Sequence, residues 1–397
     1  MRRILTIGAI VIVLLGVGSY FYFSTDSANI VVAPPGSTGL PTAGPGAALP
    51  GETEGASGVL PGAPTPVSAR LVKISAGPVV PGEVIVNKAG SASSSPEVAI
   101  SYIERTSGNV FTYLARAKTL TRTSNRTIPG IQSASWLPNA SSAFVRYLSG
   151  EDFSTINTYA LPANGVGGFF LPQNLASVAV SSTGVLMTAS GVNGSTASLA
   201  RTDGTRASQI FTTPLSAIHT SFAGKSQYLV YTKPSSSLPG TAFLVDSAGR
   251  FSRIAGPLYG LAALASPSGK WVLVSYTLDG AMQMKLVNTT SGADIALPVA
   301  TIADKCAWTE NDSSLYCGIP MDPSSNARYP DDWYQGAEHF SDRVWRIDVA
   351  SRYAQLVLDF NTETDAALDA EALAVDPLAT VLVFVNKNDG SLWSYSL

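Results

Sequence analysis

The sequence contains only two histidines and two cysteines in 397 residues, and charged residues make up only 13% of it. So few His and Cys leave little material for zinc sites or for imidazole-centred acid–base chemistry. The formal net charge is −3, and no run of Lys or Arg occurs. Nucleic-acid binding normally needs a clustered basic face, so the sequence predicts no nucleic-acid partner. The fingerprints of nucleotide-binding loops, serine hydrolases and zinc proteases are also missing, and the sequence predicts no cofactor.

What the sequence does contain favours an all-β protein. Apolar residues reach 45%, and the chain has 35 glycines and 25 prolines. Such a composition is typical of short strands joined by many tight turns, because Gly and Pro are the residues that turns require.

The first residues have the pattern of a membrane anchor. Arg2 and Arg3 precede residues 4–23, which carry no charge. A helix of that length is about 30 Å long, enough to cross the hydrocarbon core of a bilayer. The alternative is a cleaved signal peptide, but the apolar run exceeds the usual length and no small-residue cleavage site follows it. We therefore predict a transmembrane signal anchor over residues 1–27, with a cytoplasmic amino terminus and the rest of the chain outside the cell.

Residues 28–66 are rich in Pro and Gly, and the only charges among them are those of Glu52 and Glu54. Such a segment cannot bury enough apolar surface to offset the entropy cost of ordering it. The sequence thus predicts a disordered linker between the anchor and a domain over residues 67–397.

A short pattern recurs about every 43 residues from residue 131 onward. Each copy reads as a strand, a polar turn, and a second strand rich in β-branched and aromatic residues. A fixed period in the forties, with several short strands per unit, predicts a β-propeller. The first strands of successive copies end at Trp136, Val180, Phe222, Ala265, Trp308 and Val375.

The turn of one copy, Ser266-Pro267-Ser268-Gly269-Lys270, is similar to the Ser-Pro-Asp-Gly-Lys turn of the TolB-type WD40-like (PD40) propeller repeats. Ser268 stands where those repeats have Asp, and the other copies depart further. The resemblance extends over about residues 69–397 by repeat structure. It implies a propeller fold and a protein-binding or scaffolding role, and it assigns no catalytic residue.

The last unit stops after a third strand, within residues 390–397. An uncovered strand edge would invite edge-to-edge association, so another segment should pair with it. Residues 69–75 alternate apolar and polar side chains, and we predict that they pair with the strand containing Trp393 and close the ring. With residues 82–124 as the first unit this gives seven blades; six or eight remain open.

Cys306 and Cys317 flank a hairpin whose turn lies near Asn311 and Asp312. This register places the two cysteines opposite each other, close enough for a disulfide. A location outside the cytoplasm favours the oxidised form. The alternative is a pair of reduced thiols in the core.

The final repeat step is about 67 residues instead of about 43, because an insertion of residues 320–341 follows this hairpin. Three interpretations remain open: a loop that packs its aromatic residues over a neighbouring blade, a lip that binds a partner or a glycan by stacking on Trp333 and Tyr334, and a metal or catalytic site that uses its acids and His339. His219, in a first strand, reads as a hydrogen-bonded core residue. The candidate binding residues are Tyr329, Asp331, Asp332, Trp333, Tyr334, Glu338 and His339.

These patterns favour a membrane-anchored, extracytoplasmic propeller that binds a protein or envelope partner on the face of this loop and has no enzymatic activity. The alternative is an envelope glycan-binding protein or a glycoside hydrolase, in which paired carboxylates would have to lie about 5–9 Å apart.

Overall fold

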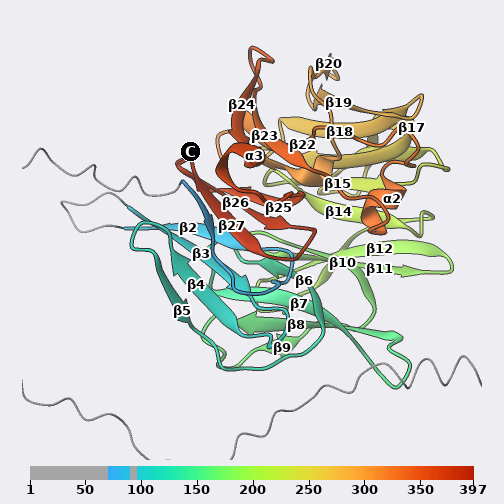
Figure 1. Ribbon diagram of the computed structural model, residues 1–397. Helices are drawn as coiled ribbons and strands as arrows, with labels where there is room; N and C mark the ends of the chain where they lie inside the picture. The colour runs from blue at the N-terminus through green and yellow to red at the C-terminus, as the bar shows by residue number, and fades with distance from the viewer. Residues whose placement is uncertain (1–69, 90–95) are drawn as a thin grey trace, which may run out of the picture. The chain divides into compact units, whose positions relative to one another are not determined.

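Figure 1 shows a computed structural model of the chain, which describes residues 70–89 and 96–397. The chain divides into Met1–Thr65 and a compact unit of Pro66–Leu397. The predicted anchor and the whole of the predicted linker lie outside the described residues. Within the described ranges, no helix is long and apolar enough to cross a membrane.

The described residues form antiparallel sheets of short strands, which follow one another in chain order in Figure 1. Five of the sheets have four strands and one has seven. The first three in chain order are built from β2 (Val84–Lys88), β3 (Glu97–Ile103), β4 (Val110–Leu114) and β5 (Thr119–Arg122); β6 (Ile131–Trp136), β7 (Ser142–Ser149), β8 (Thr155–Pro162) and β9 (Phe169–Phe170); and β10 (Leu175–Val180), β11 (Val185–Gly191), β12 (Gly194–Ala200) and β13 (Ser208–Thr213).

The seven-stranded sheet consists of two four-stranded units that share one long strand, β17, whose amino-terminal part pairs with β16 and whose carboxyl-terminal part pairs with β18. Its strands are β14 (Ile218–Ala223), β15 (Gln227–Thr232), β16 (Gly240–Asp246), β17 (Phe251–Ala265), β18 (Trp271–Leu278), β19 (Ala281–Asn288) and β20 (Asp294–Ala296). The next sheet has β21 (Cys306–Trp308), β22 (Ser314–Pro320), β23 (Asp342–Asp348) and β24 (Ala354–Asp359). Among the described residues, three short helices lie in connections: η1 (Ala303–Lys305), α2 (Asp331–Tyr334) and α3 (Phe360–Glu363).

The last sheet combines the two ends of the described chain, in the order β1-β27-β26-β25. Its strands are β25 (Ala370–Val375), β26 (Val381–Asn386), β27 (Leu392–Ser396) and β1 (Leu71–Lys73). Leu71 is opposite Tyr395 and Lys73 is opposite Trp393, the pairing predicted for residues 69–75. In Figure 1 the blue β1 accordingly lies beside the red strands.

The second strand of most units is buried on both faces. β18 and β26 read as continuous apolar runs, Val272–Val274 and Val381–Val385, because each sheet is covered by a neighbour on both sides. The apolar clusters accordingly lie between consecutive sheets. One of them joins Ile100 of β3 with Val383 of β26, so the first and last sheets also pack against each other.

Candidate functional site

The insertion predicted from the sequence lies between β22 and β23 and contains the short helix α2. Its contacts reach two units away from its own strands. Asp331 accepts hydrogen bonds from the backbone N–H and hydroxyl of Ser236, at 3.0 and 2.6 Å, in the β15–β16 connection. Thr277 of β18 donates to the carbonyl oxygen of Tyr329 at 2.9 Å. The insertion is therefore packed over the neighbouring units, as the first of the three interpretations expects.

The aromatic side chains of the insertion divide into buried and exposed ones. Trp333 is only 2% exposed, and its ring stacks on that of the buried Phe340 at 6.3 Å. Tyr329 is also buried, which raises the pKa of its hydroxyl to about 12. Tyr334 remains exposed and donates to Asp304 at 2.8 Å. Trp333 thus anchors the loop, and its ring does not offer the open stacking face expected for a glycan; Tyr334 retains that exposure.

Three acids of the insertion accept hydrogen bonds, each from a different residue. Asp332 accepts from the backbone N–H of Arg328 at 2.8 Å, which lowers the pKa of its carboxyl. Glu338 accepts a long hydrogen bond of 3.5 Å from the Tyr329 hydroxyl, and Asp331 is held by Ser236 as described above. His339 is exposed. The candidate residues share one loop, but their carboxylates do not converge on a common point.

His219, predicted from the sequence to be a hydrogen-bonded core residue, is exposed and stacks on Tyr231 with ring centroids 5.1 Å apart. Within residues 70–89 and 96–397, no three His, Cys, Asp or Glu side chains are grouped so that they could hold a metal ion.

Beneath the insertion lies a fully buried charged cluster of Lys305, Asp342 and Asp369. The Lys305 ammonium contacts Asp342 at 2.8 Å, pairs with Asp369, and donates to the Ala370 carbonyl at 3.0 Å. Asp369 also accepts from the Trp333 indole N–H at 3.0 Å. The cluster therefore joins the insertion to two inter-sheet connections through charge-assisted hydrogen bonds.

Burial raises the pKa of Asp342 to about 6, and the charge of Lys305 opposes this shift. The neighbouring Asp369 raises this pKa further. One oxygen of Asp342 has no hydrogen-bond partner within the described chain. The cluster is thus short of donors, and the loss of its single ammonium would leave two carboxylates buried without compensation.

A second acidic pair, Glu83 and Glu371, lies beside this cluster. Glu371 faces Lys387 at 3.6 Å, and the Lys387 ammonium lies 4.6 Å from the centre of the Trp333 ring. Both carboxylate oxygens of Glu83 are buried and receive no hydrogen bond from the described residues. This burial, with the nearby charge of Glu371, raises the pKa of Glu83 to about 8.

A large hollow lies at the opposite end of the sheets, where the first strands run into the turns that lead to the second strands. It has a volume of about 970 Å³, and we call it the bowl. Six hairpins contribute to it: β6–β7, β10–β11, β14–β15, β17–β18, β21–β22 and β25–β26. Its wall mixes polar and apolar residues, and the apolar ones include Pro138, Phe222, Pro267, Trp308, Leu373 and Val375.

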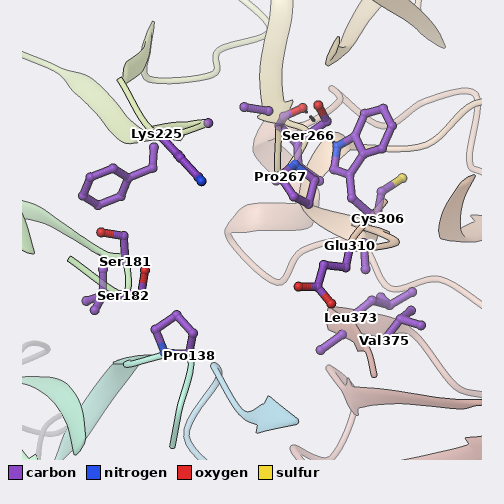
Figure 2. A pocket seen from close by; sticks show the side chains of 18 of the residues that line it. Pro138, Ser181, Ser182, Lys225, Ser266, Pro267, Cys306, Glu310, Leu373 and Val375 are labelled. Atoms are coloured by element: carbon purple, nitrogen blue, oxygen red, sulfur yellow. Dashed lines mark hydrogen bonds between the residues drawn. The ribbon is translucent and has the colours of Figure 1, made fainter. Parts of the chain in front are cut away.

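Two opposite charges extend into the bowl. Figure 2 shows Lys225, from the β14–β15 turn, and Glu310, from the β21–β22 turn, pointing into the space from opposite sides. Both are exposed, and neither has a hydrogen bond or ion pair with another described residue. The hydroxyl residues Ser181 and Ser182 lie on the side of Lys225.

The rim of the bowl is held in place by a contact between two turns. Asp312 accepts from the Ser266 hydroxyl at 2.8 Å and from the Ser268 backbone N–H at 3.2 Å, and also pairs with the Ser268 hydroxyl. The Asp that the repeat lacks at position 268 is thus replaced by a carboxylate from the next unit. Cys306, which lines the bowl, forms the predicted disulfide with Cys317.

Reasoning from the sequence missed both the bowl and the cluster. A charged residue in several turns between first and second strands was a usable signal for the bowl, because all such turns emerge at one end of the sheets. Lys305, Asp342 and Asp369 had no signal, since they are isolated charges far apart in the sequence whose burial depends on how three connections pack.

No protein-family model matches this chain, and no curated protein matches it in sequence. Solved structures do resemble it. An oligogalacturonate lyase from Vibrio parahaemolyticus is 8% identical with a TM-score of 0.56, and the match covers 82% of this chain and 93% of the lyase.

The β-propeller domain of the trilobed protease from Pyrococcus furiosus is 9% identical with a TM-score of 0.51, covering 80% of this chain and 95% of that domain. Hydrazine synthase from Kuenenia stuttgartiensis is 12% identical with a TM-score of 0.53, covering 82% and 97%. At such low identity the likeness establishes the fold alone, and that fold is a β-propeller.

Proposed function

We propose that this protein is a membrane-anchored propeller that binds a protein partner in the bowl. In this proposal residues 67–397 form seven blades closed into a ring by β1. The anchor over residues 1–27 and the linker over residues 28–66 hold the propeller outside the cell. The observation that carries the proposal is the bowl itself: a large hollow with a wall of mixed polar and apolar residues, into which two charges of opposite sign extend without a partner among the described residues.

A protein segment fits the bowl better than a small ligand does. The bowl is wide and its charged side chains are exposed, whereas small-molecule sites normally enclose most of the ligand. The first strands that form its wall, such as β21 and β25, pair on one side only. Their other edges can offer backbone hydrogen bonds to an extended peptide, while Lys225 and Glu310 select its charges.

The hydrolase alternative receives no comparable support. Glycoside hydrolysis requires two carboxyl groups that face each other across the substrate. Asp331 and Asp332 instead support the insertion through Ser236 and Arg328. A second candidate function is therefore not advanced.

Reversing the two charges of the bowl tests the binding proposal. We expect the double variant Lys225→Glu/Glu310→Lys to bind the co-purifying partner at least about tenfold more weakly, because close charge pairs across an interface are coupled. Arg253→Glu reverses the charge of an exposed residue on β17; it is the matched control and should leave binding unchanged. Binding is measured with the full chain in detergent, and thermal unfolding verifies that the fold persists. Equal affinity of the double variant and the wild type would refute binding in the bowl.

Location is tested separately. We expect protease added to intact cells to degrade a tag placed after Leu397, and an amino-terminal tag to be protected, because the arginine flank favours a cytoplasmic amino terminus. A protected carboxyl-terminal tag that becomes sensitive only after lysis would contradict the external location.

A further inference from the structure

Five consecutive units each present one large apolar side chain at the connection between their second and third strands. These side chains are between 37% and 101% exposed. We call this set the crescent: Phe153, Val192, Leu238, Leu278 and Tyr334. Because antiparallel strands alternate in direction, these connections all emerge at the end of the sheets opposite the bowl. In Figure 1 the β11–β12 hairpin and α2 accordingly project on the same side of the molecule.

Core packing does not explain the exposed side chains of Phe153 and Val192. Phe153 has a φ of 53°, in the left-handed region that bulky side chains rarely adopt, and its ring remains exposed. Val192 is at the tip of a two-residue turn. Backbone strain is normally retained where it serves a function, and an exposed aromatic ring held in such a conformation adds no core contact. Tyr334 is fixed by its bond to Asp304 and by the neighbouring Trp333 anchor.

The same connections are strongly acidic. Residues 150–154, 192–193, 233–239, 279–280 and 321–341 together carry seven acidic and two basic side chains, a net charge of −5 with His339 neutral, in a chain whose total is −3. Glu151 and Asp322 are exposed and make no hydrogen bond within the described part of the chain. The exposed apolar side chains of the crescent therefore lie in connections that carry a net negative charge.

We propose that the crescent is a second docking surface, which binds a protein partner whose contact surface combines basic and apolar side chains. Charge complementarity favours such a protein over a second copy of this chain and over a lipid bilayer. A second copy of the chain would place the same acidic surface against itself in a twofold dimer. A bilayer that carries anionic lipid would repel the carboxylates. Together with a partner in the bowl at the other end, a partner on the crescent would make the propeller a bridge between two proteins. Binding at the crescent does not require that the bowl be occupied.

Site-specific photocrosslinking tests this surface in the full chain. A photoreactive amino acid replaces Val192 in protein produced in its own cells, and Leu120, exposed on the outer strand β5, is the matched control position. We expect a protein adduct from position 192 and none from position 120. The reversal Glu151→Lys/Asp322→Lys should lower adduct yield at least tenfold, and Leu238→Ser/Leu278→Ser should do the same. With the captured protein purified, raising NaCl from 50 to 500 mM should weaken its binding about tenfold.

Several results would overturn the proposal: no adduct from position 192, an adduct with lipid or with a second copy of this chain, or a yield that the charge reversal leaves unchanged. Lys225→Glu/Glu310→Lys, which alters the bowl, should leave the crescent adduct intact. Loss of that adduct in the bowl variant would show that both faces bind one partner and would refute a separate site. Thermal unfolding of each variant distinguishes loss of binding from loss of fold.

Discussion

Replacing Lys305 by Met should lower the free energy of unfolding by about 3–5 kcal/mol, the usual cost of removing one partner from a buried ion pair. Asp342 and Asp369 would then remain at full burial without their ammonium partner. The loss should be measured by urea unfolding of the full chain in detergent. Lys225→Met, an exposed substitution of the same kind, is the control and should change stability by less than about 0.5 kcal/mol.

The same variant should loosen the insertion. Asp369 holds the Trp333 indole and the Phe340 backbone N–H, so disturbing the cluster releases both. Trypsin should then cleave after the exposed Arg328 faster than in the wild type. The triple variant Lys305→Met/Asp342→Asn/Asp369→Asn should recover part of the stability, because it leaves no unpaired buried charge. If Lys305→Met unfolds at the wild-type urea concentration, the cluster does not stabilise the folded protein.

Glu83→Gln should stabilise the protein increasingly as the pH rises, by about 3 kcal/mol more at pH 8 than at pH 5. Burial raises the pKa of this carboxyl from 4.5 to about 8. The folded chain therefore holds a proton that the unfolded chain has already released over this range. The contribution of the protonated Glu83 carboxyl to the free energy of unfolding is fully present below pH 4.5 and is lost as the pH rises toward 8. The amide does not titrate and avoids this loss.

The measurement is a series of urea unfolding curves of wild type and variant between pH 5 and pH 8. Glu151→Gln, at an exposed carboxylate, is the matched control for replacing a Glu by its amide. A difference for Glu83→Gln that does not change with pH would mean that Glu83 titrates normally in the folded protein. Asp342, with its pKa raised to about 6, shifts the wild-type curve in the same direction, but it is present in both proteins and cancels.

The strands were predictable because their pattern is local. The first strands ending at Trp136, Val180 and Trp308 have the expected limits, since alternating or continuous apolar runs between turn residues fix them. Even the long-range pairing of β1 with β27 followed from one argument, that the last unit lacks an outer strand.

The insertion was harder to predict for a physical reason. Aromatic residues in a long loop are equally compatible with exposure for binding and with burial as an anchor. The difference between Trp333 and Tyr334 depends on Asp369, which is 36 residues from Trp333 in the sequence. No local pattern contains that information. The crescent was overlooked because each of its members is a single exposed apolar residue, and only their repetition in five successive connections distinguishes them.

The long strand β17 has a consequence for how this chain could change during evolution. In repeat proteins each unit contacts only its neighbours, so the connection between two units decides whether one can be removed without the other. β17 serves as the outer strand of one unit and the inner strand of the next without a break. Removing either unit alone would cut this strand and leave the other incomplete, so these two repeats can be duplicated or deleted only as a pair.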